Sequence, residues 1–480
     1  MAVECNAAQT REPQAFCSFF GLLMSATGKQ GCAIRGRVAC LPGRLALQEN
    51  PEPFFSVSRQ AHRETWFRGA LQVAIAILLL VTQLTEPAVA ETRGKLDSSR
   101  PIRVLRPREL PATLPAGRLQ VGPGYKPSLA RLPNGELVMM FFTWERREGF
   151  YHEHAKLCRS IDQGTSWSDP VRVELGPGKD LLGRENWLTV IDDGSPHGLL
   201  FTTNHIIRVD AENPTPGTCR ATINRSTDGG ISWTQTVLPV KWSHTSRNVV
   251  QMPDGSLKVG ANNVTGGNNR WLTSTDQGLR WQESRLKLPG YTNYQGERMD
   301  YANAVGFFQE SYTYVNDARD LLQWIRLDRH SPMYAVHPDQ PTGNDNVDRL
   351  LFTRSADGGV TWSDVQDFPP YSGDLEAYGQ MYPRVIELQD SRVLMTFTRR
   401  SVTPPLGLRA VLSTDGGHTF DFSNDHLILD ENTEVGWTSG GGFGNTIQLP
   451  CGGLISVYSY ATTPQGNAHP RVEIVQWRLP

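Results

Sequence analysis

Short runs of alternating apolar and polar residues, interrupted by tight turns, are the most regular pattern of the chain. Each run enters a turn rich in Pro, Asn, Asp and Gly and resumes behind it, which predicts strand, turn and strand. Four clear copies and one looser copy occur: LPNGELVMMFF (132–142), MPDGSLKVGA (252–261), LQDSRVLMTF (388–397), LPCGGLISVY (449–458) and IDDGSPHGLLF (191–201). No long stretch repeats apolar residues at helical spacing, so the pattern favours an all-β protein.

A second phrase, built around an aspartate, recurs five times. Its hydroxyl and carboxylate side chains suit hydrogen bonds to backbone N–H groups, and its glycine allows a positive φ, so each copy predicts a hairpin turn. We expect the aspartates to hold these turns and the final aromatic residues to pack in the core. The copies are RSIDQGTSW (159–167), RSTDGGISW (225–233), TSTDQGLRW (273–281), RSADGGVTW (354–362) and LSTDGGHTF (412–420).

The two phrases alternate along the chain and together predict four strands per repeat. Repeats begin near residues 124, 184, 246, 297, 380 and 442, which predicts a six-bladed β-propeller. The last repeat lacks an aspartate phrase, and PIRVLRPREL (101–110) belongs to no repeat. We therefore expect 118–480 to form the propeller and 91–117 to supply a linker and a strand that closes the final sheet.

The segment before the repeats has the pattern of an export signal. Arg63 and Arg68 precede the apolar run ALQVAIAILLLVTQL (70–84), and a small-residue cleavage site ends at Ala90. Fifteen apolar residues are short for a bilayer span of about 20, although an uncleaved membrane anchor remains the alternative. We expect 63–90 to be a cleaved signal peptide, 1–62 to lie outside the folded protein, and the rest to be secreted or periplasmic, with no stable membrane span.

Charge and cysteine use exclude several classes of partner. The chain has 47 basic and 49 acidic residues and no basic stripe, so a nucleic-acid partner is not expected. Only Cys158, Cys219 and Cys451 follow the signal, without the spacing of a zinc site, so one disulfide at most can form. No motif indicates a metal or an organic cofactor.

On these phrases the chain resembles the sialidase (neuraminidase) superfamily, whose six-bladed propellers carry an Asp box, also called a BNR repeat, at the outer hairpin of successive blades. The resemblance covers about 118–480. It implies an active site on the ring axis, where the innermost strands begin. It also implies an arginine triad that clamps a carboxylate, an Asp acid/base, and a Tyr nucleophile activated by a Glu, an exception to the usual pair of catalytic carboxylates.

Carried over position by position, the resemblance is incomplete. The first family arginine falls on Tyr125, with Lys126 beside it, and the acid/base position falls on Glu148. The family's nucleophile position holds Phe443, which has no hydroxyl, whereas the fifth repeat offers Tyr382. The starts of the other inner strands add further candidates for contact with a substrate, namely Arg184, Glu185, Trp187, Arg247, Asn248, Arg298, Arg384 and Trp437.

These residues suggest a secreted, exo-acting, sialidase-like glycoside hydrolase for terminal, possibly acidic, sugars of glycans. Glu148 or Glu185 would protonate the leaving oxygen, and Tyr382 would attack if a carboxylate such as Glu376 activates it. Arginines would hold the sugar, and Trp187 and Trp437 would stack on it. The alternatives are a non-catalytic propeller that binds a carbohydrate or a protein, and a polysaccharide lyase on the same fold.

Overall fold

The computed structural model describes most of the chain from Leu96 to Pro480. Within the described ranges the regular structure consists of strands, β1 to β29, without a helix, which confirms the all-β prediction. The described ranges are 96–147, 150–175, 181–208, 219–241, 243–263, 269–287, 289–292, 298–300, 310–327, 349–368, 380–400, 406–433, 442–460 and 470–480.

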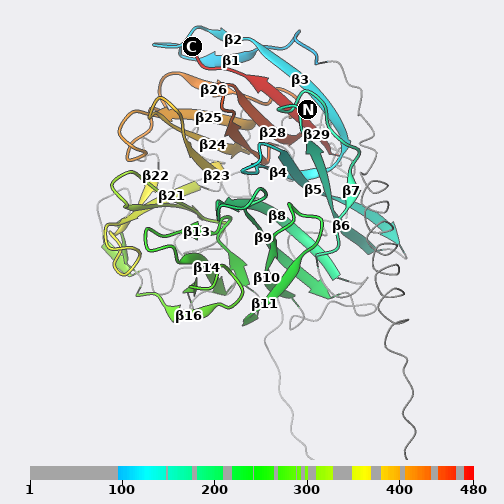
Figure 1. The fold of residues 1–480 in the computed structure, drawn as a ribbon. Coiled ribbons are helices and arrows are strands. Elements are labelled where there is room, and N and C mark those ends of the chain that lie inside the picture. The colour runs from blue at the N-terminus through cyan, green and yellow to red at the C-terminus, as the bar shows by residue number, and fades with distance from the viewer. Residues whose placement is uncertain are drawn as a thin grey trace, which may run out of the picture. The chain divides into compact units, whose positions relative to one another are not determined.

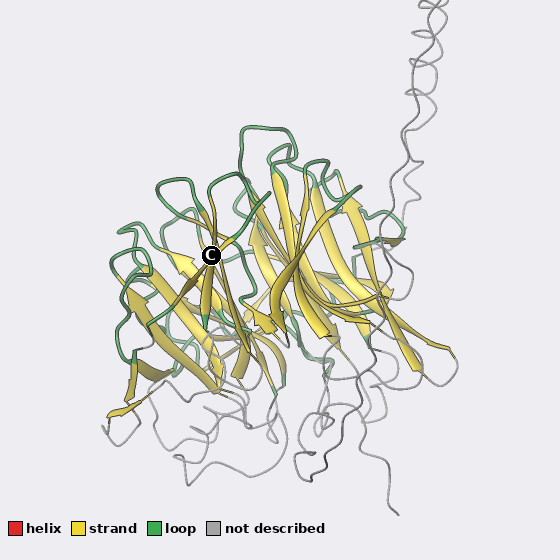
Figure 2. Cartoon of the chain, turned by 90° about the horizontal axis from the view of Figure 1, so that it is seen from below, coloured by secondary structure: helices red, strands yellow, loops and turns green. Residues whose placement is uncertain are grey.

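The strands form six sheets around a common axis, each built on four antiparallel strands, as predicted (Figures 1 and 2). Blade 1 contains β4 (Tyr125–Arg131), β5 (Leu137–Arg147), β6 (Phe150–Ser160) and β7 (Val171–Arg172). Blade 2 contains β8 (Leu181–Ile191), β9 (Leu199–Arg208), β10 (Cys219–Ser226) and β11 (Thr234–Lys241). Blade 3 contains β12 (Ser243–Thr245), β13 (Val250–Gln251), β14 (Leu257–Asn263), β15 (Arg270–Ser274) and β16 (Gln282–Arg285).

The other three blades carry additional strands or a distant one. Blade 4 contains β19 (Tyr312–Val315), β20 (Leu321–Leu327), β21 (Arg349–Ser355) and β22 (Val365–Phe368), extended outward by β17 (Gly290–Thr292) and β18 (Arg298–Asp300). Blade 5 contains β23 (Gln380–Glu387), β24 (Val393–Arg399), β25 (Gly407–Ser413) and β26 (His426–Ile428), extended by β1 (Ile102–Leu105) and β2 (Thr113–Leu114). Blade 6 contains β27 (Gly444–Gln448), β28 (Leu454–Tyr460), β29 (Arg471–Trp477) and β3 (Ala116–Pro123).

Hydrophobic clusters fill the junctions between neighbouring blades. At the junction of blades 3 and 4, for example, Val250 and Trp271 pack with Leu321 and Leu351, and all four are at least 96% buried. Full burial of each such side chain stabilises the fold by roughly 1.5–3 kcal/mol. The aromatic residue of each aspartate phrase belongs to one of these clusters, as predicted: Trp167, Trp233, Trp281, Trp362 and Phe420.

The aspartate phrases form the predicted turns. In the fourth copy, Asp357 accepts hydrogen bonds from the backbone N–H of Val360 (3.1 Å) and of Thr361 (2.8 Å) and from the Thr361 hydroxyl (2.5 Å). The Thr361 bonds lower the pKa of Asp357 to about 2, because they favour the ionised carboxylate. The bond from the backbone N–H four residues further on recurs at Asp162, Asp228, Asp276 and Asp415.

Side chains near the axis hydrogen-bond backbone groups across the blade junctions. Ser128 of blade 1 accepts from Leu188 N–H of blade 2 (2.9 Å), and Thr189 of blade 2 accepts from Val249 N–H of blade 3 (3.2 Å). Further bonds join Asn248 to Thr313, Tyr312 to Val385, Gln448 to Gln389 and Asn445 to Leu129. Because every junction has such a bond, the heights of the inner strands relative to one another are fixed.

The ring closes through β3, which pairs with β29 in blade 6. The closing strand was expected within 91–117, whereas β3 spans Ala116–Pro123. The segment 101–110, which the sequence left without a blade, extends blade 5, because its strand β1 pairs with β26. The first strand of blade 4 also differs from the expected start near 297, since β19 begins at Tyr312 and 298–300 form the outermost strand β18.

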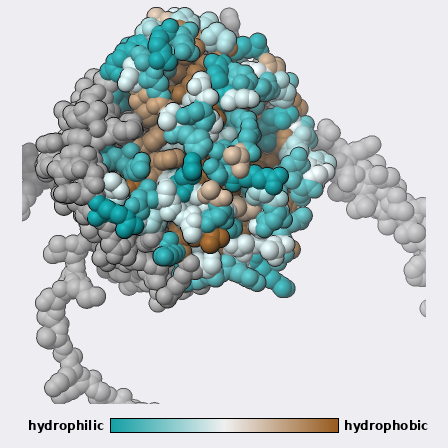
Figure 3. All heavy atoms as spheres, turned by 90° about the vertical axis from the view of Figure 1, so that its left-hand side faces the viewer, coloured by the Kyte–Doolittle hydropathy of each residue, from teal (hydrophilic) through white to brown (hydrophobic). Residues whose placement is uncertain are grey.

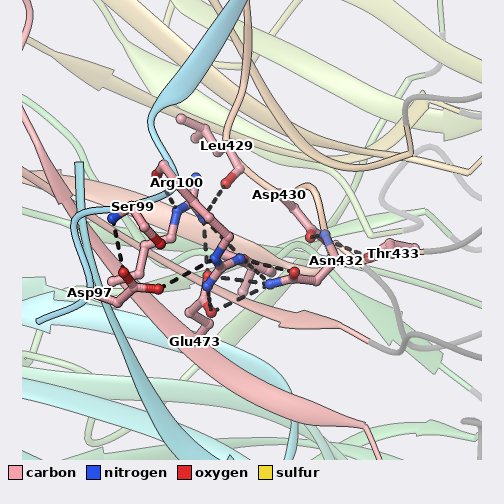
Figure 4. A network of polar contacts seen from close by, with 10 residues as sticks. Asp97, Ser99, Arg100, Leu429, Asp430, Asn432, Thr433 and Glu473 are labelled. Atoms are coloured by element: carbon pink, nitrogen blue, oxygen red, sulfur yellow. Dashed lines mark hydrogen bonds and ion pairs between the residues drawn. The ribbon is translucent and has the colours of Figure 1, made fainter. Parts of the chain in front are cut away.

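A buried polar network fastens the N-terminal segment to blades 5 and 6 (Figure 4). Glu473 on β29, fully buried, accepts hydrogen bonds from Arg118 (3.0 Å) and Arg100 (2.6 Å). Arg118 also donates to the Leu429 carbonyl (3.0 Å) at the end of β26. Burial raises the pKa of the neighbouring Asp430 to about 7, against the bonds that it accepts from Asn432 and Thr433.

Two of the three cysteines that follow the signal-like segment are free thiols. Cys158 is buried in β6, where burial raises the pKa of its thiol to about 12, and Cys451 is exposed in a turn. Neither Cys158 nor Cys451 therefore forms a disulfide.

Candidate functional site

The innermost strands of blades 1, 2 and 5 each carry a β-bulge near the ring axis. The register with the second strand shifts between Tyr125 and Ser128, between Arg184 and Trp187, and between Met381 and Arg384. Two inner-strand residues therefore face one partner residue, a geometry that re-aims side chains and often occurs beside active sites. The first extra residues are Lys126, Glu185 and Tyr382, all of which the sequence singled out.

Tyr382 lies at the centre of an aromatic cluster on the axis. Its ring packs edge-on against Phe443 of blade 6 (ring centroids 4.3 Å apart) and stacks with Trp187 of blade 2 (6.3 Å, 21° between planes). Tyr125 contacts Phe443 from blade 1. Tyr382 is 3% exposed and Trp187 is 4% exposed. The predicted sugar-stacking residue Trp187 thus lies nearly parallel to the tyrosine ring and is buried.

The Tyr382 hydroxyl is held by two cationic side chains. Lys126 Nζ donates to Tyr382 Oη at 3.3 Å, and Arg326 Nη1 on β20 donates to the same atom at 3.2 Å. Lys126 Nζ also lies 4.9 Å from the centre of the Tyr382 ring and 4.9 Å from that of Phe443. Donors with a full positive charge stabilise negative charge on the oxygen that they bind, so this phenol is suited to nucleophilic or acid–base chemistry.

Arg247 inserts its guanidinium between Trp187 and Tyr382. Its Cζ lies 3.8 Å from the centre of the Trp187 ring and 3.6 Å from that of Tyr382, which is close contact for a cation–π interaction. Arg247 lies in the break between β12 and β13, where the innermost strand of blade 3 is interrupted. Because the side chain is only 2% exposed, this cation is fixed in place from several sides.

Glu310 supplies the carboxylate of the cluster. This residue precedes β19 and is 4% exposed. Its carboxylate accepts from Arg326 Nη1 and lies 3.3 Å from Arg247 Nη2 and 4.0 Å from Lys126 Nζ. Glu310 and Arg326 were not predicted from the sequence, because the start of blade 4 was expected near 297, about fifteen residues before β19 begins. The apolar alternation of LLQWIRL (321–327) would have revealed the second strand and hence its neighbours.

Asn248 and Arg384, predicted to bind substrate, hydrogen-bond to the backbone of other blades, and their predicted contact with a substrate remains a prediction. Asn248 donates to the Thr313 carbonyl (2.7 Å) and accepts from the Thr313 N–H (3.1 Å), and these bonds join blades 3 and 4. Arg384 of blade 5 donates to the Leu188 carbonyl of blade 2 (3.0 Å), across the axis. Both side chains position strands around the cluster.

Arg298 is a clear correction. It was predicted on the innermost strand of blade 4, but β18 lies at the outer edge of that sheet. There the 70% exposed side chain pairs with Asp364 (2.6 Å). The physical reason is the parallel pairing of β17 with β22, which adds β17 and β18 outside the four blade strands.

Four other candidates lie partly or wholly outside the described residues. Glu148 and Trp437, like the suggested activating residue Glu376, belong to undescribed segments. Arg184 and Glu185 have a described backbone within β8, at the bulge, but their side chains are not described. Their predicted roles remain predictions. Within the described ranges, no group of three or more His, Cys, Asp and Glu side chains is suited to hold a metal ion.

The axial cluster therefore brings together five of the predicted residues, namely Tyr125, Lys126, Trp187, Arg247 and Tyr382. A phenol, a lysine, two arginines and a carboxylate from blades 1, 3, 4 and 5 meet within hydrogen-bonding reach. Such a convergence of proton-active and anion-binding groups is typical of active sites.

Comparison with known proteins supports the fold. No family model matches the chain, and no curated protein is significantly similar in sequence. A protein of unknown function from Dyadobacter fermentans is 16% identical with a TM-score of 0.52, over 80% of this chain and 100% of that chain. The NanB sialidase from Streptococcus pneumoniae is 13% identical with a TM-score of 0.50, over 79% of this chain and 71% of that chain. At such identities the likeness shows the fold alone: the chain is a six-bladed propeller of the kind found in sialidases.

Proposed function

We propose that the chain is an exported glycoside hydrolase that acts on a terminal sugar of a glycan at the axial end where the inner strands begin. The observation that carries this proposal is the Tyr382 hydroxyl, which accepts hydrogen bonds from Lys126 and Arg326 and whose ring contacts Arg247. Three cations around one phenol favour a sugar that bears a carboxylate. The NanB likeness in fold is consistent with carbohydrate as the ligand.

In this proposal Tyr382 is the nucleophile. Its oxygen bonds to the anomeric carbon as the glycosidic carbon–oxygen bond breaks, and the leaving oxygen receives a proton from the Glu148 or Glu185 carboxyl group. The carboxylate so formed then removes a proton from water, whose oxygen displaces the tyrosine from the anomeric carbon. Lys126 and Arg326 stabilise the phenolate before attack and after release.

A substrate screen with matched tyrosine variants tests the proposal. The protein from residue 91 onward is assayed on aryl sialosides, aryl uronides and neutral aryl glycosides. Tyr382→Phe is expected to lower kcat at least about 100-fold, because the nucleophile is lost. Tyr314→Phe serves as control, since the Tyr314 hydroxyl donates to Glu387 (3.1 Å), which is not a member of the Tyr382 cluster. Equal activity of the Tyr382→Phe variant and the wild type would refute the assignment.

Analysis of the products separates hydrolysis from elimination. Hydrolysis adds one water to the sugar, whereas a lyase acting on a uronic-acid polymer leaves an unsaturated sugar that absorbs in the ultraviolet. The 3.3 Å contact between Lys126 Nζ and Tyr382 Oη would also suit an acid–base pair for such an elimination.

A binding propeller without turnover is the second candidate. Phe443 stands where the family places its nucleophile, and it packs against a tyrosine that is only 3% exposed. Binding to a glycan array, combined with no turnover of any bound glycan, would favour this candidate.

We further propose that residues 63–90 direct export and are removed. In the described part of the chain, no helix is long and apolar enough to cross a membrane. Amino-terminal sequencing of the exported protein is expected to begin at Glu91, and a mature protein that retains 70–84 would favour the anchor instead.

A further inference from the structure

Glu310 occupies an unusual position at the head of blade 4. It is a non-glycine residue with φ of 45°, in the left-handed region, directly before the innermost strand β19. Such a conformation is strained and persists where surrounding contacts enforce it. Here the backbone contributes to the site, because the Glu310 carbonyl accepts a hydrogen bond from Arg247 Nε (3.0 Å).

The contacts of Glu310 and of Tyr382 involve the same three cations. Arg326 Nη1 donates both to Glu310 Oε2 and to Tyr382 Oη. Arg247 lies 3.3 Å from Glu310 Oε1 and stacks on the Tyr382 ring. Lys126 Nζ lies 4.0 Å from Glu310 Oε1 and donates to Tyr382 Oη. The three cations, here called the cation layer, thus each contact both the Glu310 carboxylate and the Tyr382 side chain.

We propose that Glu310 is a positioning residue that holds this layer of cations against Tyr382 and limits the positive charge that acts on its hydroxyl. The physical reason is repulsion: cations a few ångströms apart in a buried site repel one another strongly unless a carboxylate lies among them. Arg326 Nη1 donates both to Glu310 and to Tyr382. The bond to Glu310 therefore keeps this nitrogen next to the phenol oxygen.

Two further arginines lie around the cluster. Arg384, on the same strand as Tyr382, donates to the Leu188 carbonyl, and Arg400, directly after β24, contacts Met381 and lies 5.6 Å from the Phe443 ring centre. Glu310 contacts all three of the cations that contact Tyr382. Removal of the Glu310 carboxylate should therefore change the pKa of the Tyr382 phenol.

Titration of the phenol tests the role of Glu310 without a substrate. The protein is labelled with ¹³C at tyrosine Cζ, and the Tyr382 signal is identified by its loss in Tyr382→Phe. Glu310→Gln keeps the shape and removes the charge, so the midpoint of the Tyr382 titration is expected to fall by about one unit or more. An unchanged or higher midpoint in a folded Glu310→Gln protein would overturn the proposal.

Two further variants complete the test. Glu310→Asp retains the charge, so the midpoint of its Tyr382 titration is expected to lie close to that of the wild type. A shift of the midpoint as large as that in Glu310→Gln would contradict the proposal. Glu387→Gln is the matched control, because Glu387 accepts from the Tyr314 hydroxyl and should alter only the Tyr314 signal. If Glu310→Gln does not fold, Arg326→Gln is measured, and its Tyr382 midpoint is expected to rise; no rise would overturn the proposal.

The inference rests on the proposed function only in giving Tyr382 a chemical role. The titration stands even if no glycan is cleaved, so the two proposals can fail separately. Where a substrate is found, the acid limb of the kcat/KM profile of Glu310→Gln should move in the same direction as the phenol titration. A profile that does not move would overturn the role of Glu310 in the reaction.

Discussion

Three residues of the axial cluster share a backbone conformation that side-chain-bearing residues rarely adopt. Lys126, Glu310 and Tyr382 have φ of 46°, 45° and 58°. Lys126 and Tyr382 are each followed by a proline inside a β-bulge, so blades 1 and 5 use the same local device to direct two side chains at each other. Strain of this kind concentrates at functional sites, where the contacts that enforce it also fix the chemistry.

At the residue scale, Asp430 makes stability depend on pH. Its pKa is raised from 3.8 to about 7 because the carboxylate is buried, so the folded state keeps the proton longer than the unfolded state. This contribution is fully present below about pH 4 and is lost as pH rises through about 7. Asp430→Asn mimics the neutral form and is expected to be more stable than the wild type at pH 8, by about 2–4 kcal/mol, and nearly equal to it at pH 4.

Urea unfolding of both proteins between pH 4 and pH 8 measures this difference. The groups around Asp430 are Thr433 and Asn432 on its own segment, with Glu473 on β29 and Arg118 on β3. A difference that stays constant across the range, or that reverses sign, would contradict the assignment to Asp430.

The sequence predicted much of the site at this scale, with specific gaps. Tyr125, Lys126 and Tyr382 were found because they precede recognisable strand–turn–strand phrases. Glu310 was missed because the corresponding turn of blade 4 reads NDARD (316–320), in which Arg319 takes the positive φ (67°) that glycine takes at Gly135 in blade 1. Side-chain contacts across the axis, such as that of Arg384 with Leu188, depend on the closed ring and leave no local pattern.

At the element scale, the aspartate turns act as independent local structures. Asp357→Ala removes the acceptor for two backbone N–H groups and one hydroxyl, and the melting temperature is expected to fall by several degrees. Since the pKa of Asp357 is lowered to about 2, its contribution is present above about pH 4 and is lost as pH falls through about 2.

Calorimetry on Asp357→Ala and on Asp317→Ala provides the comparison for these turns. Asp317 is exposed in the inner turn of blade 4, so its substitution is expected to leave the melting temperature within a degree or so. Equal effects of the two substitutions would show that the Asp357 turn contributes nothing specific.

The phrases also explain why the elements were easier to predict than their order. Each turn is encoded by five to nine neighbouring residues, and the strands on either side alternate regularly. The additions β1, β2, β17 and β18 pair with strands far away in sequence, so nothing local indicated which sheet they would extend. Arg298 was misplaced for this reason.

At the scale of the whole molecule, the ring depends on the buried ion pairs of Glu473. Glu473→Gln leaves Arg118 and Arg100 without their charged partner in a buried site, which is expected to lower the free energy of unfolding by about 3–5 kcal/mol. Glu431→Gln is the control, because its pair with Arg103 is partly exposed and worth roughly 0–1 kcal/mol. Denaturant unfolding that shows equal losses for both variants would refute a special role of Glu473 in ring closure.

The pairing of β3 with β29 also sets an order in which the protein can fold. Blades 1 to 4 take their four inner-to-outer strands from consecutive parts of the chain and can form as synthesis proceeds. Blade 6 needs residues 116–123 and 471–477 together, a loop closure over more than three hundred residues that carries a large entropic barrier. Until the last strand arrives, β3 has an unpaired edge open to other chains, so the period just before ring closure is when this protein is most prone to aggregate.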